Sequence, residues 1–152
     1  MCDALMIIQV GEAQLPKLLP LLRAYCQFYQ VSPTDESLLA LSRALIADPA
    51  GEGVQLLAVD DHGEPTGFAT IYWSWATTIA ARLAIMNDLY VTPAARGTGV
   101  AQALIQACAA AAANRGAKQL SWQTALDNTR AQRVYDRTGA TKSTWHEYQL
   151  DL

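Results

Sequence analysis

The 152-residue sequence has few of the residues that build metal sites and disulfide frameworks. It contains two histidines and three cysteines, and none of them has the C-x-x-C or C-x-x-H spacing of a metal or redox motif. We therefore expect no metal site, and we expect Cys2, Cys26 and Cys108 to be the reduced thiols of a cytoplasmic protein. Cys26 and Cys108 fall on the apolar stripes of expected helices, where cysteine serves as a small core residue.

Charge and long apolar runs are also scarce. Charged residues make up 16% of the chain and the net charge is -3, which argues against a nucleic-acid partner. No apolar run is long enough to cross a bilayer, and the first ten residues carry Asp3 and no basic leader. We therefore expect no membrane partner, no signal peptide, and a single domain over residues 1–152.

Hydrophobic periodicity predicts an alternation of strands and helices. The first helix is predicted from about Leu15, with an early kink or a late start at its prolines. A second helix is predicted with Ser32 as its N-cap, and two more are predicted over 99–115 and over 128–139. Strands are predicted at 6–10, 54–60, 66–75, 83–91, 118–124 and 143–150. The strand–helix–strand unit around 99–115 should be a parallel crossover, so the order predicts an α/β domain with a mixed sheet.

Two glycines stand where the predicted strand 83–91 gives way to the long helix. The segment reads Arg96-Gly97-Thr98-Gly99-Val100-Ala101. A P-loop would need a lysine, which this segment lacks, and a dinucleotide fingerprint would need a glycine at Gln102. The pyrophosphate-binding pattern [RQ]xxGx[GA] is satisfied at every fixed position, because glycines let a phosphate approach the helix N-terminus. A helix start without a ligand is the alternative that this turn alone leaves open.

Two segments carry a family resemblance. "LYVTPAARGTGVAQALI" resembles the acyl-CoA-binding motif of the GNAT superfamily of N-acetyltransferases, and "NTRAQRVYDRTGA" (128–140) resembles its Asn-x-x-Ala-x-x-x-Tyr-x-x-x-Gly segment. "AYCQFY", "DLYV" and "SWQT" are more loosely similar to the polyamine- and histone-tail-acetylating branch. The resemblance implies a GNAT-like domain with a central mixed, mostly antiparallel sheet flanked by helices. It also implies acetyl-CoA as the acyl donor.

The resemblance implies a role for particular residues of this chain. Asn128 stands where the family holds the cofactor arm, and Tyr135 where it keeps a tyrosine near the thioester sulfur, a position suited to a general acid. The strand before the turn would pair with the pantetheine arm through Leu89, Tyr90 and Val91. The backbone N–H groups that would hold the pyrophosphate are those of Arg96, Gly97, Thr98, Gly99, Val100 and Ala101.

The general base is less well defined. Related enzymes often have a glutamate where this chain has Asn87. Strand alternation predicts that Asn87, Leu89 and Val91 share one side and that Asp88 and Tyr90 share the other. Asp88 is the nearest carboxylate and is our catalytic candidate, with a structural role for Asp88 and activation through water as the alternatives.

The acceptor is expected to be a small primary amine or a lysine-like one, favoured by the acidic net charge and by the branch resemblance. Tyr25, Tyr29 and Trp73 are candidates to bind it, with Trp75 as a further aromatic, although for each one taken singly an ordinary core or edge position is the favoured alternative. A non-catalytic acyl-CoA sensor is the alternative function, because the usual glutamate is missing. The terminal strand at 143–150 would expose an edge, so we expect a homodimer.

Overall fold

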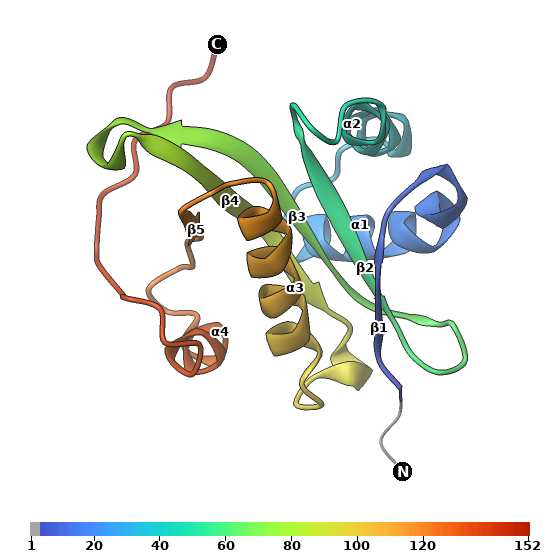
Figure 1. Cartoon of the computed structure of the whole chain (residues 1–152). Coiled ribbons are helices and arrows are strands. Elements are labelled where there is room, and N and C mark those ends of the chain that lie inside the picture. Colours follow the sequence, from blue (N-terminus) through green and yellow to red (C-terminus); the bar gives the residue numbers. More distant parts are fainter. Residues whose placement is uncertain (1–3) are drawn as a thin grey trace.

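The computed structural model describes residues 4–152, which are organised around one five-stranded sheet (Figure 1). The strands follow chain order across the sheet, as β1 (Met6–Gln9), β2 (Gly53–Val59), β3 (Pro65–Ala76), β4 (Ala81–Val91) and β5 (Gln119–Ser121). Neighbouring strands from β1 to β4 pair antiparallel, whereas β4 and β5 are parallel. The predicted mixed, mostly antiparallel sheet is confirmed.

Helices cover both faces of the sheet. α1 (Leu15–Phe28) and α2 (Asp35–Ala47) lie on one face, α3 (Val100–Asn114) lies on the other, and α4 (Thr129–Asp136) follows β5 (Figure 1). Strand side chains alternate between the faces, so β2, which is covered on both, buries all seven of its residues. One core cluster therefore joins the sheet to α1 and α2, and a second joins it to α3.

α3 approaches the sheet closely at Gly67 of β3. A Cβ atom there would lie 2.6 Å from the carbonyl oxygen of Tyr90 and 3.2 Å from side-chain carbons of Val100 and Leu104. Protein interiors leave no room for such a carbon without displacing the neighbours. The missing side chain of Gly67 therefore sets how deeply the first turns of α3 seat against β3 and β4.

β4 carries a bulge at Asn87. Thr70 of β3 lies opposite Asp88, and the next residue of β3 lies opposite Met86, so Asn87 has no partner on β3. The alternation predicted for this strand therefore holds only for residues 88–91. Asn87 is the extra residue of the bulge and does not share a simple alternation with Leu89.

Two helix boundaries differ from their predictions. α2 begins after Thr34, whose hydroxyl oxygen accepts the backbone N–H of Ser37 at 3.2 Å, so Thr34 is the N-cap in place of Ser32. α1 begins at Leu15, ahead of both prolines of its first half. The predicted late start of this helix is therefore wrong.

The segment after α4 forms no strand in the described part of the chain. The strand predicted at 143–150 is therefore wrong for a single copy. Trp145, Tyr148 and Leu150 are 84%, 93% and 83% exposed, and no backbone–backbone hydrogen bond within residues 4–152 involves residues 143–152. A strand needs a neighbour to pair with, and this segment has none in the part of the chain that the structure describes.

Cys26 and Cys108 are free thiols, with Cys108 fully buried in the core beside α3 and Cys26 partly buried on α1. Cys2 lies outside the described residues. Over residues 4–152, none of the helices is both long and apolar enough to cross a membrane. The same range contains no cluster of three or more His, Cys, Asp or Glu side chains that could hold a metal ion.

The seat of α3 can be tested by truncating Leu104, which is fully buried against the sheet. Leu104→Ala should lower the free energy of unfolding by about 2–5 kcal/mol, because it leaves a cavity in the core. The matched control is Leu126→Ala, because the Leu126 side chain is 79% exposed. This control should change the free energy of unfolding by less than about 0.5 kcal/mol. Urea unfolding of both variants provides the comparison, and equal midpoints would contradict the packing described here.

Candidate active site

The turn between β4 and α3 has the backbone that the glycine pattern predicts. Gly97 has φ +77° and Gly99 has φ +92°, both in the left-handed region that favours glycine. A Cβ atom at either position would have no heavy atom within 4 Å. The glycines are therefore needed for the path of the chain, and the space beside the turn is open.

This turn also concentrates positive charge. The Nε–H of Arg96 donates to the carbonyl oxygen of Val91 at 3.2 Å, which holds the guanidinium at the end of β4. The first intrahelical bond of α3 runs from the N–H of Ala103 to the carbonyl of Gly99 at 3.0 Å. The N–H groups before Ala103 have no partner within the helix, and they carry the positive end of its dipole. The turn can therefore bind an anion.

β4 and β5 separate beyond the middle of the sheet. β5 pairs with β4 only at Leu83, Ala84 and Ile85, while β3 pairs with β4 along almost its full length. From Met86 onward the second edge of β4 has no strand beside it in the described chain. Its backbone groups can therefore pair with an extended ligand.

A cleft of about 270 Å³ occupies the space where the strands separate. β4 and the turn form one wall, the segment after β5 and α4 form the opposite wall, and the end of α1 closes the remaining side. Twelve of the residues predicted for the site line this cleft: Tyr25, Tyr29, Leu89, Tyr90, Val91, Arg96, Gly97, Gly99, Val100, Ala101, Asn128 and Tyr135.

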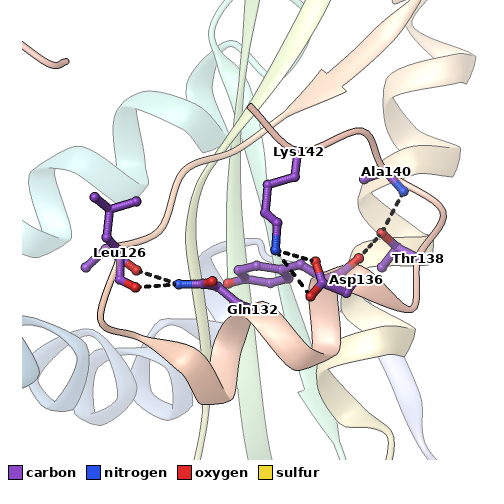
Figure 2. Close-up of polar contacts among 8 residues, drawn as sticks. Leu126, Gln132, Asp136, Thr138, Ala140 and Lys142 are labelled. Atoms are coloured by element: carbon purple, nitrogen blue, oxygen red, sulfur yellow. Dashed lines mark hydrogen bonds and ion pairs between the residues drawn. The ribbon is translucent and has the colours of Figure 1, made fainter. Parts of the chain in front are cut away.

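α4 is fixed by a set of short polar contacts. The side-chain amide of Gln132 donates to the carbonyls of Ala125 and Leu126, both at 3.0 Å, and Lys142 pairs with Asp136 at 3.1 Å (Figure 2). At the other end of the helix, the side-chain oxygen of Asn128 accepts the N–H of Ala131 at 3.2 Å as N-cap. These contacts hold both Asn128 and Tyr135 in place.

Tyr135 is half-buried on the wall formed by α4. Its ring packs edge-on against Trp122, with 5.6 Å between ring centroids. Burial, and secondarily the nearby Tyr29 hydroxyl, raise the pKa of Tyr135 above its usual value. The phenol therefore remains protonated at neutral pH and is available as a hydrogen-bond and proton donor.

The α1 wall is aromatic and is connected to the bulge. The hydroxyl of Tyr25 donates to the backbone carbonyl of Asn87 at 3.3 Å, and the Asn87 amide donates to the carboxylate of Asp88 at 2.9 Å. The rings of Tyr25 and Tyr29 lie 5.0 Å apart. Burial, followed by the charge of Asp88, raises the pKa of Tyr25 far above its usual range, so this hydroxyl is a permanent donor.

Three predicted site residues do not line the cleft within the described chain. Asp88 faces α1 beside Tyr25, and its charge contributes to the raised pKa of Tyr72, which burial chiefly raises to about 12. The indole N–H of Trp73 donates to the carbonyl of Pro49 at 2.8 Å, away from the cleft. The hydroxyl of Thr98 donates back to the carbonyl of Ala95 within the turn.

The cleft also contains residues that sequence reasoning missed. Two of them, Arg130 and Arg137, lie seven positions apart on and just after α4 and add positive charge to the wall opposite the turn. Their closeness to the Asn128 motif was the available signal. The other missed lining residues are Phe28, Met86, Asn87, Ala95, Gln102, Trp122, Gln123, Thr124, Ala131 and Val134.

A turn that can bind an anion, an unpaired strand edge and a half-buried tyrosine therefore meet in one cleft. The model of the acetyltransferase (GNAT) family matches residues 18–140 of this chain. The chain belongs to the GNAT acetyltransferase family. It is an acetyl-CoA-dependent N-acetyltransferase.

Similar proteins cover nearly the whole chain. The enzyme is 30% identical over 138 residues to YhfO of Bacillus subtilis (strain 168), an uncharacterized N-acetyltransferase, with 91% of each chain covered. It is 27% identical over 162 residues to the thialysine N-epsilon-acetyltransferase of Bos taurus, covering 96% of this chain and 92% of that one.

Solved structures share its fold. A crystal structure of a probable acetyltransferase is 30% identical and superposes with a TM-score of 0.85, with 97% of each chain covered. The aminoglycoside acetyltransferase AAC(6')-Iy, in complex with a bisubstrate analogue of CoA and acetylneamine, has a TM-score of 0.86 over 99% of each chain at 20% identity. The single-domain GNAT fold expected from the sequence is confirmed.

Proposed function

We propose that the enzyme transfers an acetyl group from acetyl-CoA directly to a primary amine in this cleft, with Tyr135 as general acid. The observation that supports this proposal is the convergence of the turn, the unpaired edge of β4 and Tyr135 around one cavity. The turn at 96–101 binds the pyrophosphate, and residues 89–91 pair with the pantetheine arm. Asn128, on the opposite wall, holds that arm in place.

Transfer begins when the neutral amine attacks the thioester carbonyl. One backbone N–H within residues 89–91 stabilises the oxyanion that forms. Collapse of the tetrahedral intermediate breaks the C–S bond, and Tyr135 donates its proton to the departing thiolate. The raised pKa of Tyr135 supports this role, because the phenol is still protonated at the pH where the amine reacts.

The proton that the amine loses passes to Asp88 through water in this proposal. Asp88 is held by the Asn87 amide at 2.9 Å and stands behind the Tyr25 hydroxyl, on the α1 side of the cleft. A direct contact with the acceptor is not needed for this role, because an ordered water can bridge base and amine.

The acceptor in this proposal is a small primary amine or a lysine-like one. Tyr25, Phe28 and Tyr29 form an aromatic wall at one end of the cleft, and an ammonium ion is attracted to ring faces. Two similar proteins are named for amine acceptors, the bovine thialysine acetyltransferase and AAC(6')-Iy. Arg130 and Arg137 lie on the α4 wall, opposite the anion-binding turn, where they add positive charge for the phosphates of the donor.

We also propose that the enzyme is a cytoplasmic homodimer. The segment 143–150 supports the dimer, because it places Trp145, Tyr148 and Leu150 in water and pairs with nothing within residues 4–152. The outer edge of β5 is unpaired in the same range, so a second copy can supply a strand neighbour. The free thiols Cys26 and Cys108 support the cytoplasmic location.

The choice between an enzyme and a non-catalytic acyl-CoA sensor is tested by thiol release. With acetyl-CoA and a panel of primary amines, the enzyme should release free CoA in proportion to acetylated amine. Diamines and lysine-like amines should react best, and hydroxyl or anionic acceptors should not react. Saturable binding of acetyl-CoA without thiol release from any amine would support the sensor instead.

Gly99→Glu tests the phosphate site. It adds a side chain and a negative charge beside the turn, so CoA affinity measured by calorimetry should fall by roughly 100-fold or more. Gly116→Glu is the matched control, because Gly116 also has a positive φ and an open Cβ position but lies at the far end of α3. Wild-type affinity in a folded Gly99→Glu variant would exclude this turn.

Tyr135→Phe tests the general acid. The fold and the CoA affinity should be retained, while kcat should fall by roughly 10²–10⁴-fold. The loss should be much smaller with an acetyl thioester of a more acidic thiol, whose thiolate leaves without a proton. The pKa of Tyr135 is raised above its ordinary value near 10. Deprotonation of the Tyr135 hydroxyl should therefore lower the wild-type kcat only above about pH 10. Nearly full activity of the variant with acetyl-CoA would mean that the proton comes from water.

The dimer is tested by light scattering on the full chain and on a chain ending at residue 142. The full chain should have twice the monomer mass, and the shortened chain should be monomeric. A full chain that stays monomeric at high protein concentration would refute the dimer.

A further inference from the structure

A second cavity lies between α2 and the sheet, apart from the acetyl-transfer cleft. It has a volume of about 290 Å³ and is bounded by α2, the chain just after β1 and the start of β2. None of its lining residues lines the acetyl-transfer cleft. The mechanism described above makes no use of it.

Two buried polar atoms in this cavity have no hydrogen-bond partner. Ser42 on α2 is 0% exposed and Gln55 on β2 is 2% exposed. The Gln55 amide nitrogen donates to the hydroxyl of Thr70 at 3.1 Å, whereas its oxygen and the Ser42 hydroxyl have no partner within the described chain. An unpaired buried polar group costs about 1–3 kcal/mol, so two of them at one cavity indicate a missing hydrogen-bonding partner.

The cavity is large enough for more than isolated water. At about 30 Å³ for each water-sized group, its volume corresponds to nearly ten such groups. This size lies at the lower end of the range of small-molecule pockets. Its rim is partly exposed at Gly11, Ile46 and Pro49, which gives a ligand a route of entry.

The lining chemistry restricts the ligand. The apolar part of the wall is formed by Val10, Leu45, Ile46, Pro49 and Val54, and among residues 4–152 no charged side chain lines the cavity. A charged ligand would lose its hydration without gaining a counter-charge, which is unfavourable. A ligand that donates to the Gln55 oxygen and exchanges a hydrogen bond with the Ser42 hydroxyl would satisfy both atoms.

We propose that this cavity is a second ligand site, for a small neutral molecule with an apolar body and two neighbouring hydroxyl or amide groups. The body packs against the aliphatic wall while the two polar groups pair with Ser42 and Gln55.

The site is also connected to the catalytic strand. Gln55, Thr70 and Asp88 stand opposite one another on β2, β3 and β4 and face the same side of the sheet. The ligand would therefore occupy the buried end of a polar row that runs from Gln55 through Thr70 to the partly buried Asp88, next to the bulge at Asn87.

The test uses trans-1,2-cyclohexanediol as probe and the ¹⁵N-labelled full-length enzyme. Backbone NMR signals of Gly11, Leu45 and Val54 should shift saturably, and those of Gly97 and Gly99 should not. Cyclohexanecarboxylate, which is charged, should produce no saturable shift at these residues. Shifts that increase linearly, or that spread over the acetyl-transfer cleft, would overturn the proposal.

Ser42→Ala provides the decisive variant. This substitution should lower the affinity for the diol by about threefold to tenfold, which corresponds to the loss of one hydrogen bond. Without ligand it should unfold at the same or a higher urea concentration, because an unpaired buried hydroxyl has been removed. The control Ser32→Ala removes an exposed hydroxyl outside the cavity. It should change neither the affinity for the diol nor the urea concentration at which the protein unfolds. Unchanged affinity in Ser42→Ala, or a loss of stability that marks a water-bonded hydroxyl, would refute the site.

Discussion

The unequal pairing of β4 is the constraint on which the rest of the site depends. One edge of this strand is paired with β3 along almost its full length, which fixes its position, while the other meets β5 over only three residues. If β5 continued alongside β4, the cleft would be filled and its backbone groups would be satisfied within the sheet. Because β5 turns away, the rigid centre of the domain keeps an unsatisfied strand edge directly before the anion-binding turn of α3.

The parts of the site that depend on local backbone could be predicted from the sequence. The glycine turn before α3 and the short helix that starts near Asn128 are properties of a few consecutive residues, and the structure has both. The bulge at Asn87 could not be predicted, because it is defined by the register with β3. Asp88 lies on the side of Tyr90, as the alternation predicts, and faces α1, so the nearest carboxylate in the sequence does not line the cleft.

Features that depend on distant packing were the ones the sequence did not reveal. The sequence predicts Trp73 as an aromatic residue of the acceptor site, but its indole N–H donates a hydrogen bond to the carbonyl of Pro49 in the loop after α2. Nothing in the sequence distinguishes Ser42 from the other polar residues of its helix, and only the packing of α2 on β2 shows that it is fully buried without a hydrogen-bond partner among residues 4–152. The segment 143–150 has the composition of a strand, but it pairs with no strand among residues 4–152 of one copy.

The close packing of α3 on Gly67 limits which residues this enzyme can have at position 67. The N-terminus of α3 carries the turn at 96–101, and the height of that turn above β4 depends on the helix resting directly on the backbone of β3. Because Gly67 has no side chain, α3 packs directly against the backbone of the sheet at this position. Any larger residue there would raise the front of α3 and change the gap between the anion-binding turn and the strand edge. The position of the turn relative to the strand edge therefore depends on a residue that lies outside the lining of the cleft.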